Sequence, residues 1–215
     1  MSRRQLADGI YLVRFDSQHS LASTFLRIQE HYESSRFRGR VFSLEEYMDW
    51  YAGRFGAFTY YQDWSGFNVP STALAPFYSG RFDPLLRKEQ QLLRLLANLK
   101  PPFYVIGLFD EHDLMHELAH ALFFLRPAYR RDVRTALRAY NTTAVARRLA
   151  SMGYHRSVLE DEVHAYVLAG SDVAGESARA LLPLRRALRS IYREHAPDLP
   201  RRGRHSRGRA KRDAM

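Results

Sequence analysis

Apolar residues recur at helical spacing through almost the whole chain after residue 110, and this pattern sets the class of fold that the chain can adopt. It predicts helices over about 112–125, 128–140, 142–152, 158–170 and 173–195. Arg126-Pro127, Asn141 and Gly153 separate them as helix-ending residues. A helix with one apolar stripe must bury that stripe against a neighbour. The second half of the chain is therefore predicted to be a packed group of helices.

The first 110 residues show a mixed pattern. Short runs rich in β-forming residues predict strands over residues 10–15 and 103–108. Helical spacing predicts helices over residues 17–33, after the capping box Ser43-Leu-Glu-Glu46, and from Asp83-Pro84 onward. Residues 56–82 are aromatic without a clear period and are predicted to be a long loop. The predicted class is α+β, mainly α.

The net charge of +10 is concentrated at the end of the chain. Residues 201–215 hold seven Arg or Lys and one Asp, so they carry +6 of that charge, and the first two hundred residues carry only +4. A run of like charges with Gly and Ser buries little apolar surface, which predicts a disordered basic tail. Such a tail either is a solvated end that aids solubility or contacts nucleic acid weakly. Residues 1–200 are predicted to form a single domain.

Composition excludes several classes of protein. No stretch approaches the eighteen or more apolar residues that a membrane span needs, and no apolar run precedes Asp8 as in a secretory signal. A soluble, cytoplasmic protein is therefore expected. The chain has no cysteine, which rules out disulfides and thiolate metal sites. Imidazole and carboxylate remain as the strong zinc ligands.

The pattern His116-Glu117-Leu118-Ala119-His120 lies on the first of the later helices. Residues four apart share one face of a helix, about 6 Å apart along its axis, so the two imidazoles can bind one Zn²⁺ ion. Glu117 follows the first ligand, where it can act as general base toward a water molecule that the metal activates. The five-residue pattern also arises by chance, in which case both histidines are ordinary helix residues.

A zinc site needs a third protein ligand, and the helix over residues 158–170 offers one. Ser157 and Glu160 form a capping box, which would occupy Glu160 at the start of the helix. Glu162 lies one turn in, beside the buried stripe of Leu159, Val163 and Tyr166. A carboxylate at the edge of a core is costly without a cation, so Glu162 is predicted to complete the site.

Other residues nearby are weaker candidates. His112 lies about 12 Å from His120 along a straight helix, too far to share an ion. Arg126 occupies the position of the third histidine of metzincins, which excludes that subclass. His164 remains an alternative ligand, and Asp161 is placed to accept the free N–H of a ligand histidine.

Together, His116, Glu117, His120 and the segment Glu162-Val-His-Ala165 resemble the motifs of the gluzincin branch of the zincin metallopeptidases. The resemblance covers about residues 103–170. It implies a zincin-like fold with a small β-sheet packed on the active-site helix, Zn²⁺ as cofactor, and hydrolysis of peptide or protein substrates. The long interval between the two motifs resembles that of minimal intracellular zincins. Tyr166 stands where several families carry Asp or Asn.

Two other functions stay open. The first is a catalytically inactive zincin whose surface binds a partner, although the intact Glu117 argues against it. The second is a nucleic-acid-binding module built on the basic tail and on the arginines of the last helix, which are Arg185, Arg186, Arg189 and Arg193. Leucines at core spacing on that helix predict that these arginines form a solvated face. The oxyanion donor is not placed among Tyr154, His155 and His164.

Overall fold

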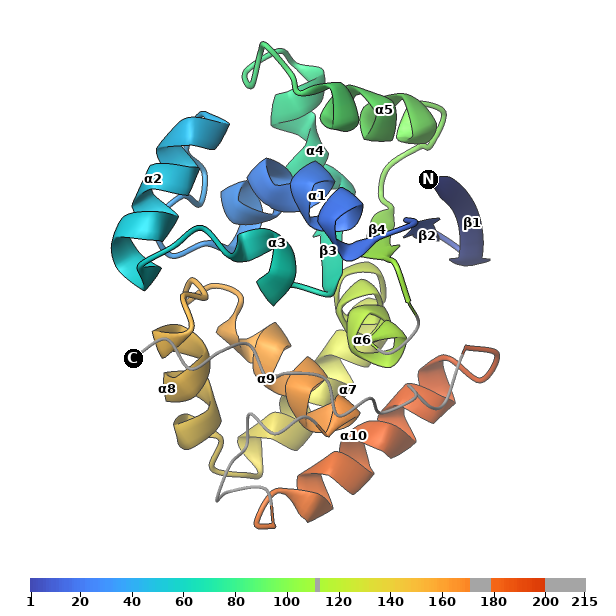
Figure 1. Cartoon of the computed structure of the whole chain (residues 1–215). Coiled ribbons are helices and arrows are strands. Elements are labelled where there is room, and N and C mark those ends of the chain that lie inside the picture. The colour runs from blue at the N-terminus through green and yellow to red at the C-terminus, as the bar shows by residue number, and fades with distance from the viewer. Residues whose placement is uncertain (111–112, 171–178, 200–215) are drawn as a thin grey trace. The chain divides into compact units, whose positions relative to one another are not determined.

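A computed structural model describes residues 1–110, 113–170 and 179–199 (Figure 1). The contacts group into two compact units, Met1–Asp110 and the residues beyond it. The predicted class, α+β and mainly helical, is confirmed. The single domain expected over residues 1–200 stays a prediction, because two such units can belong to one cooperative domain. The predicted basic tail over 201–215 lies outside the described residues.

The first unit contains a mixed sheet in the order β1-β2-β4-β3. The strands are β1 (Ser2–Ala7), β2 (Ile10–Arg14), β3 (Gly66–Pro70) and β4 (Tyr104–Leu108). β2 pairs in parallel with β4, while β1–β2 and β3–β4 are antiparallel. The two central strands, β2 and β4, are the two that the sequence predicts. β1, at one edge, has exposed polar residues and no β-forming run that would have marked it.

Five helices accompany this sheet within residues 1–110 (Figure 1): α1 (Gln18–Glu33), α2 (Leu44–Phe55), α3 (Tyr60–Asp63), α4 (Ser71–Tyr78) and α5 (Arg87–Leu96). The loop predicted over 56–82 is wrong, since α3, β3 and α4 occupy most of it. These elements are too short to show a period, and α4 contains Pro76. The predicted cap at Asp83 is also wrong, because α5 begins after Leu86, whose backbone N–H donates to Glu89 Oε2 at 2.8 Å.

Gly107 in β4 allows α1 to pack closely on the sheet. A Cβ atom at this position would lie 2.5 Å from Phe25 Cε2 and 2.8 Å from Leu21 Cδ1, both on α1. Phe25 also stacks on Phe67 of β3 with ring centroids 5.5 Å apart. The side chains around Gly107 are fully buried, so they have little room to move aside.

We expect Gly107→Ala to lower the free energy of unfolding by about 1–3 kcal/mol, the usual cost of overpacking a core. Gly53 on α2 is the matched control, because a Cβ there meets no atom within 4 Å. Gly53→Ala should stabilise the protein by about 0.5–1 kcal/mol through better helix propensity. Urea unfolding of both variants measures the difference, and equal effects would contradict the close packing of α1.

A buried acid on α1, Glu30, forms a hydrogen bond with an aromatic residue of the core. Glu30 Oε1 accepts a hydrogen bond of 2.8 Å from the Tyr60 hydroxyl. Burial, together with the nearby charge of Glu33, raises the pKa of Glu30 to about 7. Glu30 therefore holds a proton in the folded protein at pH values where the unfolded chain has lost it.

Because the pKa of Glu30 is raised on folding, its contribution favours the folded state at low pH and is lost as the pH rises through 7. Between pH 4.5 and pH 8 we expect Glu30 to lower the free energy of unfolding of the wild type by about 3 kcal/mol. In Glu30→Gln this decrease should be absent. Unfolding of variant and wild type at several pH values measures this difference. The exposed Glu46→Gln, also in the first unit, is the control, and a parallel pH dependence for Glu30→Gln and wild type would refute the assignment.

Helices account for most of the part of the second unit that the structure describes. Its helices are α6 (Leu114–Leu125), α7 (Pro127–Arg138), α8 (Thr143–Ser151), α9 (Leu159–Ala169) and α10 (Leu182–His195). α6 packs on α7 and α9, α9 also packs on α8 and α10, and α10 packs on α7. The helices predicted for this half are confirmed with bounds shifted by a few residues. Residues 171–178, which include the predicted start of the last helix, lie outside the description.

Two arginines of α10 hold the end of α9. Arg185 donates to the carbonyl oxygen of Ala169 at 3.1 Å, and Arg189 donates to that of Leu168 at 3.3 Å. These carbonyls are at the helix C-terminus, where cations are favoured. The prediction that the α10 arginines form a solvated face is therefore wrong for these two, while Arg186 and Arg193 are exposed. No described helix is both long and apolar enough to cross a membrane.

Candidate metal centre

The packing of α6 on α9 brings the two sequence motifs together within the second unit. The Nε2 atoms of His116 and His120 lie 3.1 Å apart. The Oε1 atom of Glu162 lies 3.8 Å from His120 Nε2. One ligand atom from each of the three residues lies within 4.8 Å of the others. The three predicted ligands thus converge on one point, although metal binding itself stays a proposal.

The donor set fits a zinc ion. Two imidazole nitrogens and one carboxylate oxygen form one of the ligand sets of catalytic zinc, with the fourth position left open. Ligand atoms of a tetrahedral zinc ion lie about 3.3 Å from one another. The two spacings at His120 Nε2, 3.1 Å and 3.8 Å, are close to this value, and the widest spacing in the group, within 4.8 Å, would have to shorten. His120 and Glu162 are buried, whereas His116 is partly exposed. The partly exposed side of the site is therefore the side of His116.

The charges around His120 favour a cation. Burial lowers the pKa of His120, but the carboxylates of Asp161, Glu162 and Glu117 outweigh burial and raise that pKa to about 10. The short contact between the two Nε2 atoms requires one proton between them. A divalent cation held there would replace this proton, as in other histidine sites.

Asp161 sets which nitrogen of His120 faces the other ligands. Its Oδ2 atom lies 3.0 Å from His120 Nδ1 and accepts the hydrogen of that nitrogen. This leaves Nε2 directed at His116 and Glu162. The contact matches the role that the sequence suggested for Asp161. Although burial works in the opposite direction, the charge of His120 lowers the pKa of Asp161, so this carboxyl stays ionised as an acceptor.

Glu117 is buried on α6 between the two ligand histidines in sequence. Its charge contributes to the raised pKa of His120, which places its carboxylate within electrostatic reach of the imidazole. Glu117 lies on an otherwise strongly apolar helix, next to Leu118 and Ala119, which are fully buried. An acid buried at this position is suited to proton transfer, because the low dielectric strengthens its interaction with a neighbouring proton donor.

A pair of tyrosines lies beside His116. The ring of Tyr166 packs on the His116 imidazole at a centroid distance of 4.6 Å, and its hydroxyl lies 3.2 Å from the hydroxyl of Tyr154. Tyr154 is among the candidates that the sequence suggests, whereas Tyr166 is expected there only as a member of the buried stripe. The spacing in the sequence could have placed Tyr166 near the site, because it lies one helical turn after Glu162 and both residues are on one side of α9.

The other sequence candidates have different roles. His164 is fully buried, its pKa is lowered by burial, and it contacts Asp161, so it does not join the ligand group. The capping box predicted at the start of α9 is wrong: Ser157 contacts His155 Nδ1 at 2.9 Å, and Glu160 accepts from Arg134 at 2.7 Å. Glu160 is therefore bound by a side chain of α7, while Ser157 has a local partner. His112 lies outside the described residues.

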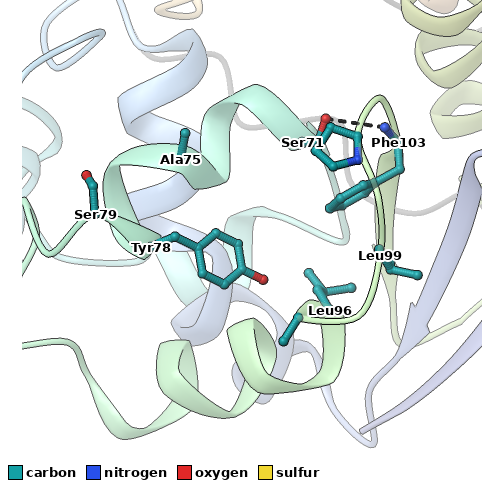
Figure 2. A pocket seen from close by; sticks show the side chains of 9 residues that line it. Ser71, Ala75, Tyr78, Ser79, Leu96, Leu99 and Phe103 are labelled. Carbon is teal, nitrogen blue, oxygen red and sulfur yellow. Dashed lines mark hydrogen bonds between the residues drawn. The ribbon is translucent and has the colours of Figure 1, made fainter.

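A pocket in the first unit has a different character (Figure 2). It has a volume of about 470 Å³ and lies between α4 and the end of α5. Its walls are mostly apolar, and the Tyr78 hydroxyl donates to the Leu93 carbonyl oxygen at 2.9 Å. Ser71 Oγ accepts from the Phe103 backbone N–H at 3.2 Å (Figure 2). No carboxylate, imidazole or cationic side chain is among the described residues that line this pocket, so it offers no donor set for a metal.

Comparison of the chain with models of protein families, with curated proteins and with solved structures finds no match. The interpretation of the site therefore depends on its geometry and on the motifs of the sequence.

We expect the purified protein to bind about one Zn²⁺ ion per chain, and Glu162→Gln to weaken that binding by at least about 100-fold, because removal of a ligand costs more than the 10–100-fold typical of outer partners. Glu160→Gln on the same helix is the matched control, since Glu160 is exposed and bound to Arg134. Competition with a chromogenic chelator measures the affinity. Equal zinc affinity in the two variants would show that Glu162 is not a ligand.

Proposed function

We propose that this protein is a zinc-dependent metallopeptidase, similar to the gluzincin branch of the zincins, that hydrolyses peptide bonds in peptide or protein substrates. The observation that supports the proposal is the meeting of His116, His120 and Glu162 at one point with Glu117 buried beside them. The sequence resemblance named these residues, and three of them lie together at the packing of α6 on α9. A zincin-like fold is part of the same proposal.

Each residue has a chemical role in this proposal. His116, His120 and Glu162 hold the ion, and Asp161 keeps the His120 ring in the orientation that presents Nε2. Zn²⁺ supplies Lewis acidity, which lowers the pKa of a water molecule and polarises the substrate carbonyl. Glu117 accepts the proton of the attacking water and donates it to the leaving amine. Tyr166 offers a phenol beside His116, on the partly exposed side.

A catalytic role accounts for this site better than a structural one. A structural zinc ion has four protein ligands, whereas His116, His120 and Glu162 supply three among the described residues. Glu117 would also have no use in a structural site, and burying an acid carries a cost. The nucleic-acid alternative loses support from α10, where Arg185 and Arg189 bond to the end of α9.

We expect Glu117→Gln to retain zinc and to lower the rate of peptide hydrolysis by about 10²–10⁴-fold, the usual contribution of a positioned general base. The amide keeps the shape of the side chain but cannot accept the proton. A mixed peptide library analysed by mass spectrometry detects cleavage whatever residues flank the scissile bond. Glu160→Gln serves as control, and a chelator should abolish cleavage by the wild type. Hydrolysis by Glu117→Gln at the wild-type rate would defeat the proposal.

A further inference from the structure

A buried histidine beside the candidate metal centre has both ring nitrogens engaged. His164 Nδ1 lies 3.4 Å from Asp161 Oδ1, and His164 Nε2 lies 2.8 Å from the Tyr129 hydroxyl. The same carboxylate accepts from His120 through its other oxygen, Oδ2, at 3.0 Å. Asp161 therefore lies between two imidazoles, one a candidate ligand and the other outside the group of candidate ligands.

The direction of each hydrogen bond follows from the donors available. Since the Asp161 carboxylate only accepts, the nitrogen that faces it on each histidine carries the hydrogen. A neutral His164 then has a lone pair on Nε2, and the Tyr129 hydroxyl donates to it. The hydrogen bonds run from Tyr129 to His164, and from both His164 and His120 to Asp161.

Three helices hold the His164 ring in place. The ring stacks on Phe123 of α6 with centroids 5.5 Å apart at an interplanar angle of 25°. Tyr129 comes from α7, and Asp161 lies one turn before His164 on α9. His164 has no exposed surface, so its nitrogens are shielded from bulk solvent. A ring fixed in this way can in turn fix the rotation of the carboxylate that it contacts.

We propose that His164, held by Tyr129, is a positioning residue that fixes the orientation of the ligand His120 through the Asp161 carboxylate. The inference deepens the proposed function, because it concerns how this chain prepares the zinc ligand before the ion binds. Without the His164 N–H, Asp161 Oδ1 loses its donor and the carboxylate can rotate away from His120. The Nε2 atom of His120 is then aimed less well at the ion, and affinity falls.

Two substitutions of His164 separate its two hydrogen bonds. In His164→Asn the amide nitrogen takes the place of Nδ1, so the donor to Asp161 remains and the contact with Tyr129 is lost. In His164→Gln the amide reaches the place of Nε2, so the contact with Tyr129 remains and the donor is lost. Both variants lose the stacking on Phe123, which makes each the control for the other.

We expect His164→Asn to bind Zn²⁺ within about threefold of the wild type and His164→Gln to bind it about tenfold more weakly. The absorption spectrum of the Co²⁺-loaded protein should change in His164→Gln and return to the wild-type form in His164→Asn. In a double-mutant cycle, adding His164→Gln to Asp161→Asn should lower the zinc affinity little further, because both substitutions act through the Asp161 carboxylate. Equal affinities for the two His164 variants, or additive losses in the cycle, would overturn the proposal.

A measurement on the wild type keeps the proposal testable if a variant fails to fold. A long-range ¹H–¹⁵N spectrum of the metal-free protein should show hydrogen on Nδ1 of His164 and an unprotonated Nε2. The opposite tautomer would overturn the proposal directly. Zinc binding that responds to His164 without any peptide hydrolysis would refute the peptidase and leave the positioning role intact, so the two failures are distinguishable.

Discussion

The candidate site depends on the pairing of buried carboxylates with one imidazole where α6 packs on α9. Asp161 and Glu162 approach opposite nitrogens of His120 at 3.0 Å and 3.8 Å. Such burial is costly unless the charges are compensated. Against the effect of burial, the carboxylates of Asp161, Glu162 and Glu117 raise the pKa of His120, so their charge favours a cation at this imidazole. Under the proposed function, a divalent cation between neutral imidazoles would compensate this charge in place of the proton.

Buried acids elsewhere in the chain are stabilised without any metal ligand set. Glu89 is paired with Arg27, whose Nε donates to Oε1 at 2.8 Å. Glu30 accepts from the Tyr60 hydroxyl, and burial raises the pKa of Glu30 to about 7, so it keeps its proton at lower pH. A buried carboxylate is therefore not by itself a sign of a metal centre in this protein. The distinguishing feature of the α6–α9 site is the pair of facing imidazole nitrogens beside the acid.

The sequence predicts those helices and strands that are long enough to show a periodic spacing of apolar residues. It places the helices α6 and α9 correctly, and also the three residues that converge, because the five-residue motif fixes two of them and Glu162 follows from an acid beside a buried stripe. Short elements such as α3 and α4 carry no readable period. Partners that arrive from elsewhere in the fold, such as Arg134 at Glu160 and Tyr129 at His164, have no signal in the sequence around them.

Because of the helical geometry of α9, residues within one turn of this helix contact both ring nitrogens of His120. Successive residues of a helix are separated by about 100° around its axis, so Asp161 and His164 lie close together on one side while Glu162 points away from Asp161. Asp161 thus reaches Nδ1 of His120 and Glu162 reaches its Nε2. The short segment that supplies the third candidate ligand therefore also supplies the group that contacts the second, His120. A substitution that shifts α9 by a fraction of a turn would disturb both contacts at once.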